Sequence, residues 1–364
     1  MGSDDRLSEA GAKRTVGYLV LAVLACCALA FFVTRTKPAG AVLGTLALPH
    51  VPKELPAIHK LTLEPLTPEL RKKGFHECNP HDPLGLGPYA PYERLSLGRA
   101  LIPQKGGHTP DMGFDVLVHF HGGEAARKAL VQVTRGLVLV IVDLGTGGGP
   151  YARWLGQPGQ FPRLRASIEA ALQRKTGDPR AHIRHLALSS WSAGSVAINK
   201  IIEQHQPGID AMIMLDGLHA GYKPNAPRIQ ELRNLEVAFL KPAIEVARCA
   251  ARGETTFVIT HSQIDPVKYP GTNISADLLL DQLGLERKTL DPGDDPFGQI
   301  SAVNVKGLHV WGFKGRNEAA HCIHLRLIGR IANEILERQW NTPPMDRSVT
   351  AGVIEPWQRQ GAGN

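Results

Sequence analysis

Ser192 has the surroundings expected of a reactive hydroxyl. It lies in 186-LALSSWSAGSVAINKII-202, where an apolar run is followed by small residues and then by an amphipathic segment. A strand that enters a helix through so short a turn strains the residue at the apex and lifts its side chain above the sheet. Ser190, Ala193 and Gly194 are small enough to let the two backbones approach, and the positive helix N-terminus faces any anion formed on the serine. The pattern predicts a nucleophilic serine.

His119 and His121 are the residues that could instead bind a metal. They alternate at the end of a strand-like run, so their side chains share one face. His321 or an aspartate would have to complete the site, but the chain has no suitable Cys pair and no His-Glu-x-x-His pattern. The glycine-rich run at 143–151 lacks the spacing of a dinucleotide loop. We therefore expect no metal and no other cofactor.

Alternating strand-like and helix-like segments must position these side chains. The apolar, β-branched runs that predict strands buried on both faces are 114–120, 137–144, 183–189, 210–216, 255–261 and 305–313. The helix-like segments are about 162–174, 193–205, 236–251, 274–284 and 319–338. This alternation predicts an α/β fold, a mostly parallel sheet flanked by helices. Residues 92–103 alternate more loosely and predict an antiparallel pair at the sheet edge.

Residues 90–338 resemble the α/β-hydrolase superfamily, and in particular its serine esterases and lipases. The family places its nucleophile in Gly-x-Ser-x-Gly; here the motif is Ser190-Trp191-Ser192-Ala193-Gly194, with serine replacing the first glycine. The resemblance implies the α/β-hydrolase fold, with Ser192 as nucleophile and Trp191 in contact with substrate.

The run 119-HFHGGEAARK-128 resembles the oxyanion loop of esterases in this superfamily. In that loop, glycine N–H groups point at the alkoxide that develops during acyl transfer. The resemblance implies an oxyanion hole formed by Gly122 or Gly123 together with Ala193, and a substrate contact from His121.

Two aspartates compete for the place of the triad acid. In the family a strand ending in His-Gly-x-x-Asp-Pro commonly supplies this acid; here His261, Asp265 and Pro266 match and Ser262 replaces the glycine. Asp216 ends the preceding strand, and some members take their acid from that place. We expect Asp265, by a narrow margin over Asp216.

His321 stands where the family carries its triad histidine, just after the last strand. The chain order of Ser192, an aspartate and His321 is the order of the superfamily. The resemblance implies hydrolysis of a carboxylic ester by a Ser-His-Asp triad, acting on a small-molecule or lipid-like substrate. The alternative is a catalytically inactive α/β-hydrolase-like domain that binds a partner at a membrane surface, because a fold does not fix a function.

The N-terminal part of the chain predicts a membrane anchor. Residues 16–33 (VGYLVLAVLACCALAFFV) are uncharged and long enough to span a bilayer as one helix. We expect the catalytic domain outside the cytoplasm, periplasmic or extracellular, and a secreted protein if the segment is instead a cleaved signal. A lipoprotein signal ending at Cys26 is a third, weaker interpretation.

The remaining chain divides by composition. We expect a short tail at 1–15, a Pro-rich linker at 34–75, one domain at 76–340 and an irregular tail at 341–364. The net charge of +7 comes from scattered Lys and Arg without a nucleic-acid-binding motif, so no nucleic-acid partner is expected. Cys78, Cys249 and Cys322 lie outside the apolar run and allow at most one disulfide among them.

Overall fold

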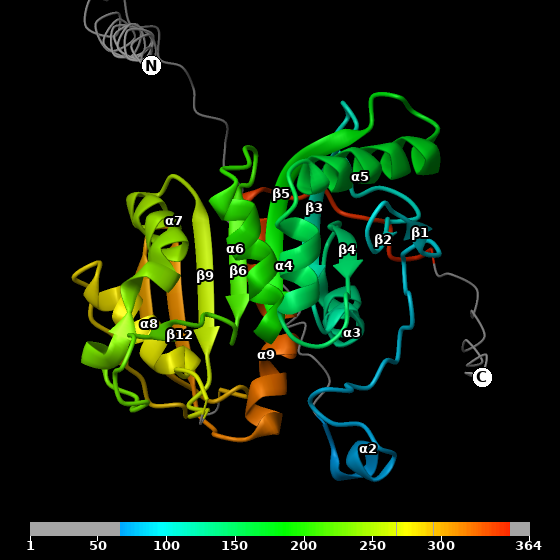
Figure 1. Ribbon diagram of the computed structural model, residues 1–364. Helices are drawn as coiled ribbons and strands as arrows, with labels where there is room; N and C mark the ends of the chain where they lie inside the picture. Colours follow the sequence, from blue (N-terminus) through cyan, green and yellow to red (C-terminus); the bar gives the residue numbers. More distant parts are fainter. Residues whose placement is uncertain (1–65, 267, 294, 350–364) are drawn as a thin grey trace, which may run out of the picture. The chain divides into compact units, whose positions relative to one another are not determined.

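A ten-stranded mixed sheet lies at the centre of the fold (Figure 1). The computed structural model describes residues 66–266, 268–293 and 295–349. The strands of this sheet, in spatial order, are β1 (Glu93–Arg94), β2 (Arg99–Leu101), β4 (Val138–Val142), β3 (Gly113–Phe120), β5 (His182–Trp191), β6 (Ala211–Leu215), β9 (Thr256–His261), β12 (Leu308–Phe313), β11 (Gln299–Val305) and β10 (Lys288–Thr289). Two further short strands, β7 (Gly221–Tyr222) and β8 (Leu235–Glu236), pair with each other.

The strands from β4 to β12 in this order are parallel, and both edges of the sheet are antiparallel. The predicted α/β fold with a mostly parallel sheet is therefore confirmed, as is the antiparallel pair within 92–103. The prediction of one strand over residues 305–313 is wrong. These residues form the end of β11 and the whole of β12. The chain turns between the two strands at Lys306 and Gly307, and Lys306 has a φ of 50°.

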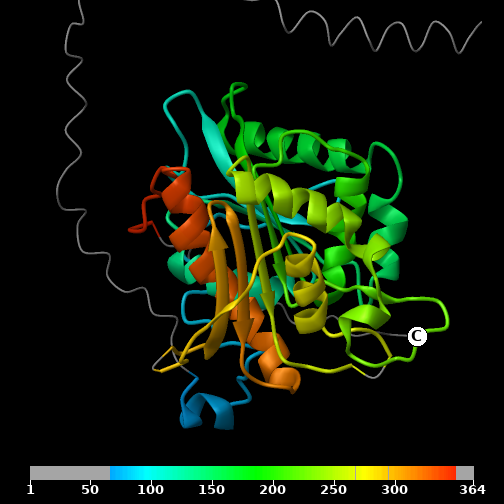
Figure 2. The same cartoon turned by 90° about the vertical axis from the view of Figure 1, so that its left-hand side faces the viewer.

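Helices cover both faces of the sheet (Figures 1 and 2). One face packs against α4 (Gly149–Leu155), α5 (Gln160–Thr176), α6 (Ser195–Glu203), α7 (Lys241–Arg252) and α8 (Thr272–Asp281). The other face packs against α3 (Gly123–Val133), α9 (Glu318–Ile331) and the π-helical turn η4 (Ala332–Glu337) that continues α9. All eight residues of β3 are buried, which is why its sequence is apolar throughout instead of alternating.

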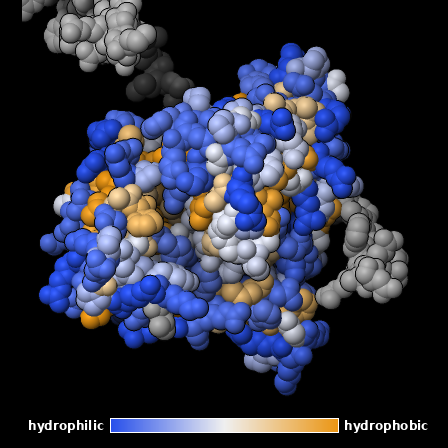
Figure 3. All heavy atoms as spheres, viewed as in Figure 1, coloured by the Kyte–Doolittle hydropathy of each residue, from blue (hydrophilic) through white to orange (hydrophobic). Residues whose placement is uncertain are grey.

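Short helical pieces complete the secondary structure. They are α2 (Pro68–Lys72), η1 (Ser192–Gly194), η2 (Leu232–Asn234) and η3 (Val237–Leu240). The surface in the view of Figure 1 is mostly hydrophilic, with hydrophobic residues interrupting it around α7 (Figure 3).

Both ends of the described part of the chain are attached to the rest of the domain, one by a disulfide and the other by a backbone bridge. Cys78 forms a disulfide with Cys322 on α9, and Cys249 is a free thiol. After Trp340 the backbone is irregular, but Met345 is buried and bridges to Gly106. This part of the predicted tail therefore packs against the domain.

The predicted anchor lies outside the described residues. This holds for the tail at 1–15, the apolar run at 16–33, most of the linker at 34–75 and the end of the chain from 350. None of the helices in the described part of the chain combines the length and apolarity of a membrane span.

Candidate active site

Ser192 stands at the junction between β5 and α6. Its φ of 50° lies in the left-handed region, and its side chain is half-buried. The turn is tight enough to require glycine at 194, because a Cβ there would lie 2.8 Å from the Cβ of His121 and closer still to the Phe120 carbonyl. The strained apex predicted from the sequence is therefore present.

Ser190 stands where the family motif has glycine, and its hydroxyl has a hydrogen-bond partner in the turn. The side chain is fully buried, and its Oγ lies 2.9 Å from the Oγ of Ser195. A buried hydroxyl without a partner would destabilise the fold, so this bond explains how serine replaces glycine here.

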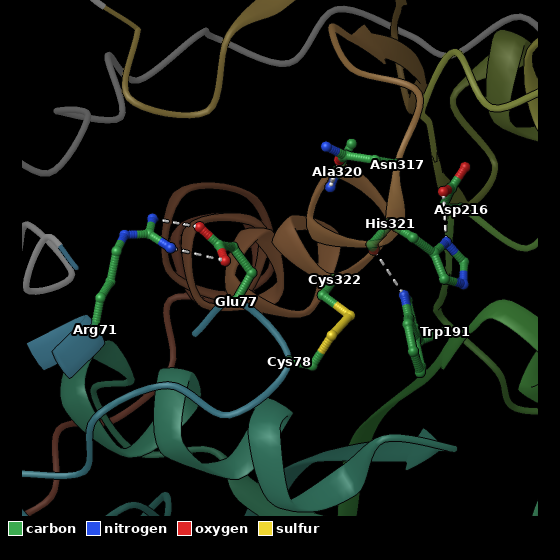
Figure 4. Close-up of a disulfide and its surroundings, with 9 residues drawn as sticks. All are labelled: Arg71, Glu77, Cys78, Trp191, Asp216, Asn317, Ala320, His321 and Cys322. Atoms are coloured by element: carbon green, nitrogen blue, oxygen red, sulfur yellow. Dashed lines mark hydrogen bonds and ion pairs between the residues drawn. A yellow bond between two sulfur atoms is a disulfide. The ribbon is translucent and has the colours of Figure 1, made fainter. Parts of the chain in front are cut away.

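Asp216 is the acid that the structure pairs with His321. The Nδ1 atom of His321 lies 2.6 Å from Asp216 Oδ2 (Figure 4). Asp216 follows β6 directly, has φ 44° and is buried. Its other oxygen accepts hydrogen bonds from the Ser262 N–H, at 2.8 Å, and from the Thr272 hydroxyl. Three hydrogen bonds therefore hold the carboxylate in one orientation toward the histidine.

The expected preference for Asp265 over Asp216 is corrected by this geometry. Asp265 is exposed on the loop after β9 and makes no hydrogen bond or ion pair within the described residues. The strand end that carries it contributes Ser262 instead, which binds Asp216. The Asp265 charge acts instead on Tyr222, whose pKa is raised first by burial and then by this charge.

A second histidine lies behind the acid. His324, one helical turn after His321, is fully buried, with Nε2 3.9 Å from Asp216 Oδ2 and Nδ1 2.7 Å from the Thr260 hydroxyl. Burial lowers the pKa of His324 to about 4, so its ring is neutral at neutral pH. Burial alone would raise the pKa of Asp216, but the two histidines and Thr272 hold that pKa well below its usual range.

Trp191 fixes the first turn of α9 against the serine turn. Its Nε1–H donates to the carbonyl of His321 at 3.0 Å, and the two rings lie 4.5 Å apart (Figure 4). The His121 ring stacks on Trp191 at 5.3 Å. His321 keeps 24 % of its side chain exposed, so solvent and substrate can reach it. No hydrogen bond joins the Ser192 hydroxyl to His321 within the described chain; in the absence of substrate such bonds are often long.

The glycine loop after β3 offers one of the two expected N–H donors. The Gly123 N–H donates to the Asp143 carboxylate at 3.1 Å and is therefore occupied. Gly122 has φ 71°, and a Cβ there would lie 2.9 Å from both Trp191 and Leu325. Of the two glycines expected to share the oxyanion hole with Ala193, Gly123 therefore has its N–H bonded to Asp143.

His121 borders the site from the same loop, whereas His119 does not. His121 has φ 72°, and its Nδ1 lies 3.3 Å from the Tyr151 hydroxyl; burial lowers its pKa. His119 is buried beneath the loop with Nδ1 3.0 Å from the Ser189 hydroxyl. The two rings bind different partners, and no group of three His, Cys, Asp or Glu side chains suited to a metal occurs in the described ranges.

Sequence reasoning missed the residues that support this site. Thr272 and Ser262 bind Asp216, Asp143 binds Gly123, and Tyr151 contacts His121. Each of these contacts joins residues at least 20 positions apart. No local pattern could have revealed them, although Asp143 ends a predicted strand at the same sheet edge.

Comparison with solved structures returns proteins of low sequence identity. An uncharacterised protein from Capnocytophaga ochracea is 11 % identical, over 67 % of this chain and 64 % of that protein, with a TM-score of 0.39. An IroE-like serine hydrolase from Shewanella oneidensis is 12 % identical, over 68 % of this chain and 80 % of that one, with a TM-score of 0.37.

The enterobactin esterase Fes from Shigella flexneri is 12 % identical, over 71 % of this chain and 64 % of that one, with a TM-score of 0.39. No family model matches the sequence, and no curated protein matches it. The function is therefore inferred from the arrangement of Ser192, His321 and Asp216 in this chain.

Proposed function

We propose that this protein is a serine hydrolase of the α/β-hydrolase superfamily that cleaves a carboxylic ester. The observation that carries the proposal is the pairing of His321 with the buried Asp216 at 2.6 Å, beside a serine held at φ 50° between a strand and a helix. A neutral imidazole that donates its Nδ1 proton to a carboxylate presents Nε2 as a base.

Each residue has a defined step in the reaction. Ser192 Oγ attacks the ester carbonyl while His321 Nε2 takes the hydroxyl proton, and the carbonyl oxygen becomes an oxyanion that accepts hydrogen bonds from Gly122 and Ala193. The C–O bond to the alcohol then breaks, and His321 returns the proton to the leaving oxygen. Water attacks the acyl-serine in the same way and releases the acid. Asp216 stabilises the imidazolium during both steps.

Labelling with a fluorophosphonate probe tests this function. We expect the full-length protein to be labelled and Ser192→Ala to be unlabelled, because the probe forms its bond only with an activated serine. His321→Ala should lose about 10³-fold or more in labelling rate. His119→Ala is a poor control because that side chain is in the core; His205→Ala, on the surface after α6, is the matched control and should label normally.

A folded wild-type protein that is not labelled would contradict the hydrolase. It would favour the binding domain, the second function considered for this fold. The location is part of the same proposal: residues 16–33 anchor the chain, with the catalytic domain outside the cytoplasm.

A further inference from the structure

A cavity of about 500 Å³ is lined by residues that the proposed mechanism does not use. Its walls come from two loops at the carboxyl ends of β6 and β9, residues 220–228 and 268–270. Ligands of open α/β sheets bind outside the carboxyl ends of the strands. The position of the cavity is therefore that of a substrate site.

Both walls lie close to Asp216 along the chain or to residues that bind it. The first wall begins four residues after it, at Ala220. The second wall lies between Ser262 and Thr272, which both bind the Asp216 carboxylate. The loop that leads into the first wall also passes the serine, because a Cβ on Gly217 would lie 2.6 Å from the Ser192 carbonyl oxygen.

His219 lies three residues after Asp216 and is in contact with the cavity wall. Its ring meets that of Tyr269 edge-on at 5.3 Å. The Nδ1 atom of His219 is buried and has no hydrogen-bond partner within the described chain. It is close enough to Asp216 and His321 for their charges to affect it. His219 therefore contacts the lining residue Tyr269 on one side and is influenced by the charges of the proposed acid–base pair on the other.

The lining is cationic. Lys223, Arg228 and Lys268 contribute three positive charges, and all three are exposed at the mouth. Lys223 is held in place because its Nζ donates to the Arg233 carbonyl at 2.8 Å. None of the lining residues is an Asp or a Glu, so positive charge is in excess along the lining, although the nearby Asp265 charge acts on Tyr222. Such an excess attracts anions.

Exposed apolar side chains surround the same loops. Among the described residues, Ile229, Phe239 and Tyr269 are 52 %, 61 % and 50 % exposed, which is unusual for side chains of this size. Phe239 packs over Gly221 in the cavity wall, and Tyr269 is itself part of the lining. The cavity therefore combines cationic and apolar surface.

We infer that this cavity binds an anionic group, carboxylate or phosphate, on the ester that Ser192 cleaves. The inference rests on the proposed hydrolase and adds the substrate class: esters whose acyl or alcohol part carries a negative charge a few bonds from the scissile carbonyl. Tyr269 and its exposed neighbours contact the alkyl part of such a molecule.

A pair of esters of equal length tests this inference. Mono-4-nitrophenyl glutarate carries a terminal carboxylate, and 4-nitrophenyl pentanoate is its neutral counterpart. We expect a higher kcat/KM for the glutarate. The double variant Arg228→Gln with Lys268→Gln should lower that preference by about 5- to 10-fold and leave pentanoate hydrolysis within about 2-fold of wild type.

Two single variants sharpen the test. Asp265→Asn removes the opposing charge and should raise the preference for glutarate. Lys175→Gln, on the exposed end of α5, also removes one positive charge but should leave the preference unchanged. Raising the salt concentration from about 50 mM to about 500 mM should weaken the preference in the wild type, because exposed charges are screened.

The outcomes separate this inference from the proposed function. If wild-type protein reacts with the fluorophosphonate but does not distinguish the two esters, the cavity is not an anion site and the hydrolase stands. Equal loss on both esters in the double variant would also overturn the anion site, since it would indicate a general disturbance of the loops. Absence of fluorophosphonate labelling would overturn both proposals.

Discussion

Three residues of the candidate site have left-handed backbone conformations. His121, Ser192 and Asp216 have φ of 72°, 50° and 44°. They are the residues that directly follow strands β3, β5 and β6, respectively. Each such conformation costs of order 1–3 kcal/mol in a non-glycine residue and persists only where surrounding contacts impose it. Here those contacts are the Asp216 hydrogen bonds and the stack of His121 on Trp191. The strain is located where side chains must leave the sheet and converge.

The choice of acid can be tested by exchanging one carboxylate at a time. Asp216→Asn should lower kcat toward a neutral ester by about 10³- to 10⁴-fold, because an amide in that place favours the wrong tautomer of His321. Asp265→Asn should leave kcat for that ester within about 2-fold of the wild-type value, because Asp265 makes no contact with His321. Steady-state kinetics on 4-nitrophenyl pentanoate measures both.

The reverse result would restore the acid expected from sequence. To separate lost chemistry from lost folding, both variants should be compared with the wild type by thermal unfolding. A large loss of kcat in an Asp265→Asn protein that unfolds at the wild-type temperature would contradict the assignment of Asp216.

Ser192 could be predicted from sequence and Asp216 could not, for a physical reason. The serine turn is local: the strand, the small residues and the helix all lie within 186–202. The acid is chosen by contacts across the sheet, since Asp216 depends on Ser262, Thr272 and His321, which lie 46 to 105 positions away in the chain. Two aspartates after neighbouring strands look equivalent until those contacts are known.

At the scale of elements, α9 is the helix whose position determines where the proposed base lies. It carries His321 and His324, and its first turn is fixed by three different bonds. The Asn317 side chain caps it by accepting from the Ala320 N–H, Trp191 donates to the His321 carbonyl, and Cys322 is bonded to Cys78. Figure 4 shows the disulfide and the His321 ring on neighbouring residues of this turn.

Loss of the disulfide should weaken both stability and activity. Cys78→Ser removes a link between residues 244 positions apart, and we expect the free energy of unfolding to fall by about 2–4 kcal/mol. We also expect kcat to fall more than KM changes, because the first turn of α9 then positions His321 less firmly. Denaturant unfolding and steady-state kinetics measure the two effects.

Cys249→Ser is the matched control for this prediction. It also replaces a thiol with a hydroxyl, but Cys249 is free and lies on α7, away from α9. A stability and a kcat equal to wild type in Cys78→Ser would show that the disulfide does not support α9.

The buried Glu337 in η4 should make the free energy of unfolding depend on pH. Its carboxylate accepts hydrogen bonds from the N–H groups of Arg135 and Gly136, at 2.6 and 3.0 Å, yet burial raises its pKa to about 7. The unfolded value is about 4.3, so the folded state binds more protons between about pH 4 and pH 7. The contribution of Glu337 to the free energy of unfolding therefore falls as pH rises through this window, by roughly 3–4 kcal/mol in total.

Glu337→Gln should remove that contribution. The amide oxygen can still accept from the two N–H groups, but the side chain no longer titrates. Urea unfolding of both proteins at about pH 5 and about pH 8 gives four free energies, and the wild type should lose more than the variant between them. Parallel changes in the two proteins would show that Glu337 does not titrate in this range.

The central strands were predictable because every residue of β3, β4, β6 and β9 is buried, which leaves continuous apolar runs in the sequence. The exceptions lie at the sheet edge. β10 has two exposed residues and no apolar signal, and β11 merges in sequence with β12 across the Lys306–Gly307 turn. Edge strands are stabilised by pairing with a neighbour, which a single-sequence pattern does not contain.

At the scale of the whole molecule, the proposed anchor at 16–33 would place the proposed hydrolase at a membrane. An ester that is both anionic and apolar suits such a place, because molecules of that kind gather at membrane surfaces. The anchor and the anionic cavity are separate proposals, but they favour the same class of substrate.

Membrane fractionation tests the anchor. The full-length protein should sediment with membranes and stay there after an alkaline carbonate wash, whereas a chain starting at residue 40 should be soluble. Leu24→Arg places a charge in the middle of the run, which costs about 2.5–3.5 kcal/mol of insertion free energy, and should release part of the protein. Leu24→Ile is the matched control and should behave as wild type. A mature protein whose N-terminus lies beyond residue 33 would instead identify the run as a cleaved signal, and the hydrolase would then work free of the membrane.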